Sequence, residues 1–141
     1  MDTSALLDIT KVVETLIAEH RADTTLTHHA GDVNIDHRRT HEAVVTACRP
    51  QPGHPVNALL SSEVPYAMDW QLSGSAPVFA PNWFVGIADT FDRKLARLDV
   101  YTIALRAWLH PHSQQSAEHL VRWLGATVGV DAAEAFMLGR Q

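Results

Sequence analysis

The sequence predicts an α/β fold whose sheet is mostly parallel. Short β-branched runs alternate along the chain with longer segments in which apolar residues recur at helical spacing. This alternation is typical of βαβ units, which set parallel strands side by side and place helices on the faces of the sheet. The chain has 141 residues, of which 46% are hydrophobic and 19% are charged, enough for one folded core. We therefore expect residues 1–141 to form a single domain.

The first two predicted elements are a helix and a strand. The helix runs from Ser4 to His20, and Thr3 or Ser4 can serve as its N-cap. The β-branched run 24–28 predicts a buried strand, and the Gly and Asx residues of 29–34 predict the loop that follows it. The apolar stripe of the helix consists of Leu6, Ile9, Val13, Leu16 and Ile17.

The middle of the chain predicts one more helix and two more strands. Residues 36–48 predict a helix, and the proline-rich segment 49–55 ends it because proline lacks an N–H donor and disfavours helix before it. Strands are predicted at 58–64 and 83–87. Proline and glycine punctuate the segment 65–82 between them, which predicts an irregular connection.

The last third of the chain predicts two helices and a closing strand over 133–138. Asp89 or Thr90 can cap the first helix, and Ser116 can cap the second, which a glycine ends. These elements complete the expected alternation of helices and strands. The inward face of the first of these helices is predicted to consist of Phe91, Leu95, Leu98, Thr102 and Leu105.

Charge and composition exclude several classes of protein. Eleven basic and sixteen acidic residues give a net charge of −5, and this sign argues against a duplex-binding surface, which needs a basic face. The single cysteine, Cys48, cannot form a disulfide within the chain, which fits a reducing compartment. The uncharged stretch 70–88 contains Pro and Gly and does not predict a membrane span, and no signal peptide is visible. We expect a cytoplasmic protein that does not bind nucleic acid and has no membrane span.

The densest group of polar side chains lies between Thr27 and His41, where a predicted strand ends and a helix begins. A helix N-terminus offers backbone N–H groups and a positive dipole to an anionic ligand or an oxyanion, and imidazole and carboxylate groups are ligands of zinc. Asp36 is next to His37 and suits either the metal or the orientation of an imidazole. An interpretation without a metal site also stays open. The chain has nine histidines, so a histidine-rich loop can arise by chance, and Asp32 and Asp36 are also ordinary turn and cap residues.

A longer stretch of the sequence resembles a known family. The run Thr27–Arg38, Thr-His-His-Ala-Gly-Asp-Val-Asn-Ile-Asp-His-Arg, is similar to the second conserved block of the PIG-L (LmbE-like) zinc-dependent de-N-acetylases, in their bacterial branch. Weaker similarities at 62–65, 79–85, 110–111 and 133–136 extend the resemblance over nearly the whole chain. The resemblance implies the C-terminal part of a Rossmann-like, three-layer α/β/α fold.

The resemblance also implies a zinc-dependent reaction. The family holds its metal with three protein ligands, and His37 matches the third of them. The other two ligands and the general base belong to a His-Pro-Asp-Asp-Glu motif, which this sequence lacks. The metal activates water for attack on an N-acetyl carbonyl, commonly that of an acetylated amino sugar. By the same resemblance, Asp36 supports His37, while Asn34 and His110 lie near the acyl oxygen or the substrate.

A second candidate function belongs to a different class. Because two ligands and the base are missing, the chain is also interpreted as an inactive fragment or a split subunit that acts only as a binding or oligomerisation module. The resemblance places the family's first strands ahead of this chain, which predicts an unpaired sheet edge and an uncovered helix face. We therefore expect a homo-oligomer or a complementing N-terminal segment as a partner, besides a small N-acetylated substrate. The histidines interpreted as structural or solvated are His20, His28, His41 and His119.

Overall fold

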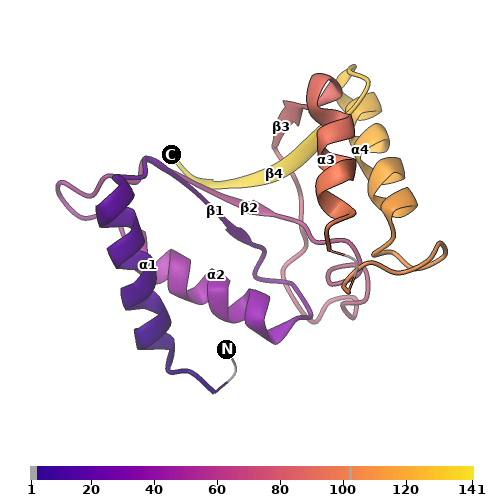
Figure 1. Ribbon diagram of the computed structural model, residues 1–141. Coiled ribbons are helices and arrows are strands. Elements are labelled where there is room, and N and C mark those ends of the chain that lie inside the picture. Colours follow the sequence, from indigo (N-terminus) through magenta and orange to yellow (C-terminus); the bar gives the residue numbers. More distant parts are fainter. Residues whose placement is uncertain (1–2, 102) are drawn as a thin grey trace. The chain divides into compact units, whose positions relative to one another are not determined.

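The computed structural model describes residues 3–101 and 103–141, so Thr102, predicted to lie on a helix face, falls outside the described residues (Figure 1). The chain divides into two compact units, the first made of 1–81 and 136–141 and the second of 82–135. Each unit has a hydrophobic core of its own. The single-domain expectation stays a prediction.

The first unit begins with α1, which spans Leu6–His20. Ala5 occupies the N-cap position and makes no side-chain cap bond, so the predicted caps, Thr3 and Ser4, do not serve α1. At the other end, Arg21 adopts a left-handed backbone conformation with φ 49°, which ends the helix. The apolar periodicity therefore predicts this helix correctly, whereas the capping chemistry at its start does not.

A βαβ unit follows, made of β1 (Thr24–His28), α2 (Ile35–Ala47) and β2 (Ala58–Ser62). β1 and β2 pair in parallel, with His28 opposite Ser62 at one end. In Figure 1, α2 lies along β1, and α1 packs against α2. The prolines after Cys48 end α2 as predicted. The core between these helices and β2 is formed by Ile17, Val44, Ala47, Cys48 and Leu59.

The sheet contains four strands in the order β1-β2-β4-β3, where β3 spans Trp83–Gly86 and β4 spans Ala133–Arg140. β2 pairs with β4 in antiparallel fashion, and the sheet as a whole is mostly antiparallel. The predicted mostly parallel sheet is therefore wrong. A parallel neighbour needs a crossover that carries the chain back to the starting end of the sheet, usually a helix. β4 instead enters the sheet at the end where β2 leaves it, since Ser62, the last residue of β2, pairs with Phe136 near the start of β4. The fold is mixed α/β, and its three-layer arrangement stays a prediction.

The second unit contains β3, a 3₁₀ turn at Ala88–Thr90, α3 (Phe91–Leu98), α4 (Gln114–Val128) and the first residues of β4. α3 is shorter than predicted. Of the residues just beyond its end, Val100, Tyr101 and Ile103 are exposed. The two clusters of the core are formed by Ile87, Phe91, Leu95, Val121 and Ala132, and by Phe84, Leu120, Leu124, Ala133 and Ala135.

α4 begins one turn earlier than predicted. Its N-cap is Ser113, whose side chain accepts a hydrogen bond from the backbone N–H of Ser116, the residue predicted to cap it. Gly129 ends the helix in a left-handed conformation, with φ 79°. Gly125 lies where the backbone passes close by: an added Cβ would sit 2.6 Å from the carbonyl oxygen of Val130.

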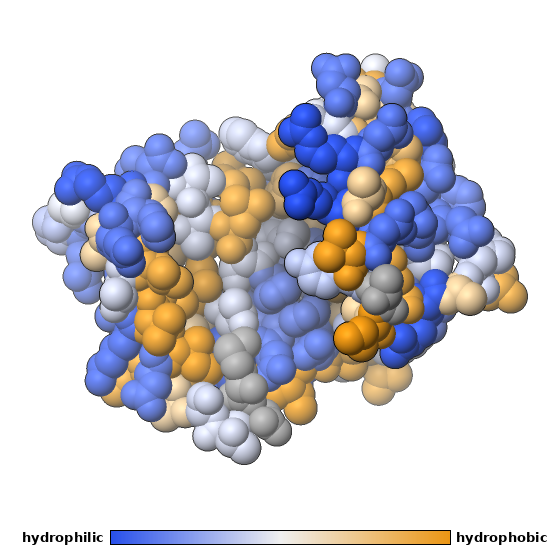
Figure 2. All heavy atoms as spheres, in the orientation of Figure 1, coloured by the Kyte–Doolittle hydropathy of each residue, from blue (hydrophilic) through white to orange (hydrophobic). Residues whose placement is uncertain are grey.

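Apolar side chains remain at the surface of α1. Leu7 is 62% exposed, and Val12 and Leu16 are also exposed. Orange apolar spheres reach the surface over this helix in Figure 2. In residues 3–101 and 103–141, none of the helices combines the length and the apolar character that crossing a bilayer requires.

Candidate metal centre

The candidate site is built on the loop 29–34, which joins the end of β1 to the start of α2. The loop folds through short-range bonds between side chains and backbone. The N–H of Gly31 donates to His29 Nδ1 at 3.0 Å, and the N–H of Asn34 donates to Asp32 Oδ1 at 2.7 Å. The N–H of Asp36 then donates to Asn34 Oδ1 at 2.9 Å, which caps α2. Gly and Asx residues therefore produce the predicted turn, and they set the position of each polar side chain in it.

Further bonds fix this loop to the rest of the first unit. Arg38 Nη1 donates to the carbonyl oxygens of Asp32 and Val33, each at 2.8 Å. The N–H of Val33 donates to the carbonyl oxygen of Ala67 at 2.8 Å. His41 Nδ1, on α2, donates to the carbonyl oxygen at the end of β1 at 2.8 Å. The site is thus held by its own strand, its own helix and the segment after β2.

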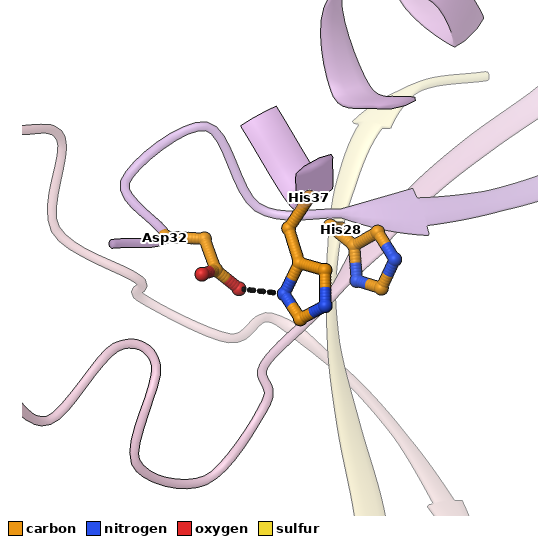
Figure 3. Close-up of side chains that lie close together, drawn as sticks. All are labelled: His28, Asp32 and His37. Carbon is orange, nitrogen blue, oxygen red and sulfur yellow. Dashed lines mark hydrogen bonds and ion pairs between the residues drawn. The ribbon is translucent and has the colours of Figure 1, made fainter. Parts of the chain in front are cut away.

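Three side chains with metal-ligand atoms meet at this loop: His28 from β1, Asp32 from the loop and His37 from α2 (Figure 3). Their ligand-type atoms all lie within 4.8 Å of one another. His37 Nδ1 is 2.7 Å from Asp32 Oδ2, and Asp32 is completely buried. The rings of His28 and His37 are stacked, with centroids 3.9 Å apart and planes 7° apart.

Burial sets the protonation preference of two histidines here. It lowers the pKa of His28, and the neighbouring His37 lowers that pKa further, while Asp32 opposes both effects. Burial also lowers the pKa of His29, with a smaller lowering from His41. Lowered values favour neutral imidazole, the form that binds a metal ion through a lone pair.

The side chains of this group are of the types that bind a divalent metal ion such as zinc. Two imidazoles and one carboxylate belong to the ligand set that zinc sites use. In addition, His28 Nδ1 is buried without a hydrogen-bond partner among the described residues. A buried polar atom without a partner costs about 1–3 kcal/mol, and the hydroxyls of Thr25 and Thr27 on the same strand are also without a partner among the described residues.

The residues predicted from the sequence fall in three different places. His37 belongs to the group of three. Asn34 caps α2, and Asp36 lies in the first turn of α2 outside the group. His110 belongs to the second unit, where its Nδ1 accepts the N–H of His112 at 3.0 Å. The structure places Asp32 rather than Asp36 at the Nδ1 atom of His37. The roles expected for Asn34, Asp36 and His110 stay predictions.

Sequence reasoning misses two members of the group. By sequence alone His28 is interpreted as structural, and Asp32 stays open as a turn residue. The position of His28 at the last residue of a strand could have indicated it, because ligands gather at strand ends in α/β sheets. The contact between Asp32 and His37, five residues apart, depends on the path of the loop, and no spacing rule predicts it.

Comparison with known proteins supports the fold. No family model matches the chain, and no curated protein matches its sequence. Solved structures do match it: the conserved protein TT1542 from Thermus thermophilus has a TM-score of 0.67 and 20% identity, and the match covers 93% of this chain and 57% of that protein. The N,N'-diacetylchitobiose deacetylase from Pyrococcus horikoshii, in complex with its inhibitor MPG, has a TM-score of 0.68 and 14% identity, over 96% of this chain and 52% of its own.

A third match is GalB, the 4-carboxy-2-hydroxymuconate hydratase from Pseudomonas putida KT2440, with a TM-score of 0.66 and 17% identity, over 98% of this chain and 60% of its own. At these identities the likeness shows a shared fold alone, and a deacetylase and a hydratase share it. This chain spans between 52% and 60% of the length of the three structures.

Proposed function

We propose that this chain supplies the histidine side of a divalent-metal centre in an enzyme that removes an N-acetyl group from an acetylated amino-sugar derivative. One observation carries the proposal. The family resemblance assigns His37 to the metal. In the structure His37 belongs to the His28–Asp32–His37 group, which was found among residues 3–101 and 103–141 as side chains close enough to hold a metal ion. The resemblance rests on sequence alone, so the grouping of these side chains in space supports it independently.

Each of the proposed site residues has a chemical part in this reaction. When bound, Zn²⁺ supplies Lewis acidity to the carbonyl of the acetamide. His37 binds the ion, and we assign Asp36, in the first turn of α2, the support of His37 on the resemblance alone. The positive end of this helix favours negative charge on the acyl oxygen. Asn34 keeps its amide N–H groups for donation, because its Oδ1 already accepts a backbone bond. We assign a substrate contact to His110 on the resemblance alone.

A second candidate is the binding or oligomerisation module that the sequence also suggests. The exposed apolar side chains of α1 and the edge position of β1 favour it. Leu26 on this edge strand is 55% exposed, and an exposed edge can pair with another chain. In this case the chain contributes its histidine to a shared assembly without catalysing a reaction by itself.

Titration of the purified chain with Zn²⁺ tests the metal centre. We expect His37→Ala to weaken Zn²⁺ binding by more than the roughly 10–100-fold that loss of a supporting partner costs. The matched control is His20→Ala, which removes an exposed histidine at the end of α1 and should leave the affinity unchanged. Equal affinities in wild-type and His37→Ala protein would refute the proposal.

Acetate release separates the two candidates. The chain is incubated with Zn²⁺ and an N-acetylglucosamine derivative, and acetate is measured against a protein-free blank. Release that disappears in His37→Ala supports the deacetylase. Binding of Zn²⁺ that depends on His37, without any release of acetate, supports the module instead.

A further inference from the structure

We infer that Asp32 is the positioning residue of His37: it holds the Nδ1–H of the imidazole and thereby keeps Nε2 as the metal-binding nitrogen, without binding the ion itself. The inference rests on the proposed function for the role of His37. It assigns different parts to three side chains whose proximity alone would suggest three ligands of one ion.

The first argument is a distance. His37 Nδ1 and Asp32 Oδ2 are 2.7 Å apart, which is the length of a hydrogen bond between an N–H group and a carboxylate. Two ligand atoms of one tetrahedral zinc ion, each about 2.0–2.1 Å from it, lie roughly 3.3 Å apart. The two atoms are therefore too close to bind one ion together, and they are at the right distance to share a proton.

The second argument follows the remaining bonds of Asp32. Its Oδ1 accepts the N–H of Asn34 at 2.7 Å, and Arg38 holds its carbonyl oxygen at 2.8 Å. The residue is completely buried, so its carboxylate needs both of its partners to be hydrogen-bond donors. His37 must then donate through Nδ1, and the tautomer that carries its proton on Nδ1 is the one that offers the Nε2 lone pair to a metal ion.

The third argument concerns the face of the ring. His28 stacks on His37 with the two planes 7° apart. The lone pairs of an imidazole lie in the plane of its ring, so two parallel stacked rings cannot both direct a lone pair at one ion. His28 therefore limits the rotation of the His37 ring, while Asp32 holds the Nδ1–H of that ring by a hydrogen bond. The imidazole is held from both directions, as the ligating histidines of metal sites generally are by their supporting partners.

Imidazole NMR of the metal-free chain tests this inference without any reaction. Long-range proton–nitrogen spectra show which nitrogen of His37 carries the proton. We expect Nδ1 to be protonated and Nε2 bare in the wild-type chain. On addition of Zn²⁺, the Nε2 resonance of His37 should move while Nδ1 keeps its proton and the His28 nitrogens stay in place.

The variant Asp32→Asn reverses the expected tautomer. The N–H of Asn34 would keep the amide oxygen, so the amide NH₂ would take the place of Oδ2 and face His37 Nδ1. Nδ1 would then have to accept, and the proton would move to Nε2, as happens when the triad aspartate of a serine protease becomes asparagine. We expect this tautomer in the spectrum and a roughly 10–100-fold loss of Zn²⁺ affinity. The control, Glu42→Gln on the exposed side of α2, should change neither.

The outcomes distinguish the inference from the proposed function. Protonation of His37 at Nε2 in the wild-type chain, or an unchanged tautomer in folded Asp32→Asn, overturns the inference, even if Zn²⁺ binding depends on His37. Conversely, an Nδ1–H tautomer that Asp32→Asn reverses upholds the positioning role even if this chain alone binds Zn²⁺ too weakly to measure. If Asp32→Asn does not fold, the tautomer of His37 in the wild-type chain alone tests the inference.

Discussion

Two histidine turns in this chain lead into helices: 28–34 before α2 and 109–113 before α4. In both, the Nδ1 atom of a histidine accepts the backbone N–H two residues further on, at 3.0 Å. In both, a polar side chain caps the helix that follows, Asn34 in the first turn and Ser113 in the second. The backbone is thus stabilised in the same way in the two turns.

Among the differences between the two turns, one bears on the site: the presence of an acidic residue. The first contains an acid, Asp32, which is completely buried and joins the N–H of Asn34 to the ring of His37. The second contains none, and its cap closes on a hydroxyl, with Ser113 Oγ donating to Ser116 Oγ at 2.9 Å. A histidine turn before a capped helix is therefore an ordinary folding device, and a buried carboxylate is what gives one of these turns an oriented imidazole.

Removing the acid should produce the largest effect. Asp32→Ala leaves the Asn34 N–H and His37 Nδ1 without their buried acceptor, and we expect it to lower the unfolding free energy of the first unit by about 3 kcal/mol or more. Ser113→Ala removes a neutral cap from the second unit and should cost about 1 kcal/mol. Native-state hydrogen exchange in urea measures each unit separately. Equal losses in the two units would show that the carboxylate adds nothing beyond an ordinary cap.

A pair of glycines tests whether the first turn needs its backbone path. An added Cβ at Gly31 would collide with the carbonyl oxygen of Pro77, and one at Gly125 would lie 2.6 Å from that of Val130. Each Gly→Ala change should cost about 1–3 kcal/mol, because overpacking displaces the backbone. Only Gly31→Ala should also weaken Zn²⁺ binding, since it displaces the loop that carries Asp32. Calorimetric titration of both variants with Zn²⁺ measures this difference. A loss of Zn²⁺ affinity in Gly125→Ala would contradict the prediction.

The stacked ring of His28 should contribute a smaller effect. His28→Phe keeps an aromatic ring against His37 and removes the buried nitrogen that has no partner among the described residues. We expect His28→Phe to retain Zn²⁺ binding. His28→Ala removes the stacked ring, so it should lower the unfolding free energy by about 1 kcal/mol and weaken Zn²⁺ binding several-fold. If Phe and Ala abolish binding equally, His28 is itself a ligand of the ion.

The sequence predicts the elements of this fold better than their arrangement. The apolar stripe of residues 6–17 and the proline-rich end of α2 are local features, so spacing and turn chemistry suffice for them. The direction of β4 depends on the end at which the chain re-enters the sheet after β2, and packing between distant segments decides that end. The end of α3 is a second example: the helix ends at Leu98 although the apolar spacing continues, and Val100, Tyr101 and Ile103 beyond it are exposed.

The candidate site could be predicted in part. His37 can be singled out because the run 27–38 resembles a family block. The two residues that hold it cannot. Asp32 resembles any Asx turn residue in the sequence, and only the loop path brings its carboxylate to 2.7 Å from a ring five residues later. Asp36 is next to His37 in the sequence, but adjacent residues on a helix do not face each other. Closeness in sequence therefore does not predict which acid contacts His37.

The smallest predicted effect is a dependence of stability on pH in the second turn. Burial lowers the pKa of His112, and this effect outweighs the hydrogen bond to the Ala104 carbonyl, which raises it. In the unfolded chain the imidazole takes up a proton near its ordinary value of 6.5, whereas the folded chain does so only at lower pH. Stability of the second unit is therefore fully present above that value and falls as the pH decreases through it, levelling off below the folded pKa.

The variant His112→Gln isolates this contribution. The unfolding free energy of the second unit is measured by hydrogen exchange in urea on the metal-free chain, between about pH 5 and 8. This free energy should depend less on pH in His112→Gln than in the wild-type protein. Ser113→Ala, one residue away, should leave the slope unchanged because a hydroxyl does not titrate in this range. The first unit should show a dependence of the same sign, since burial lowers the pKa of both His28 and His29. A stability that rises as the pH falls would contradict this prediction, because it would mean that these imidazoles gain a partner for their charged form on folding.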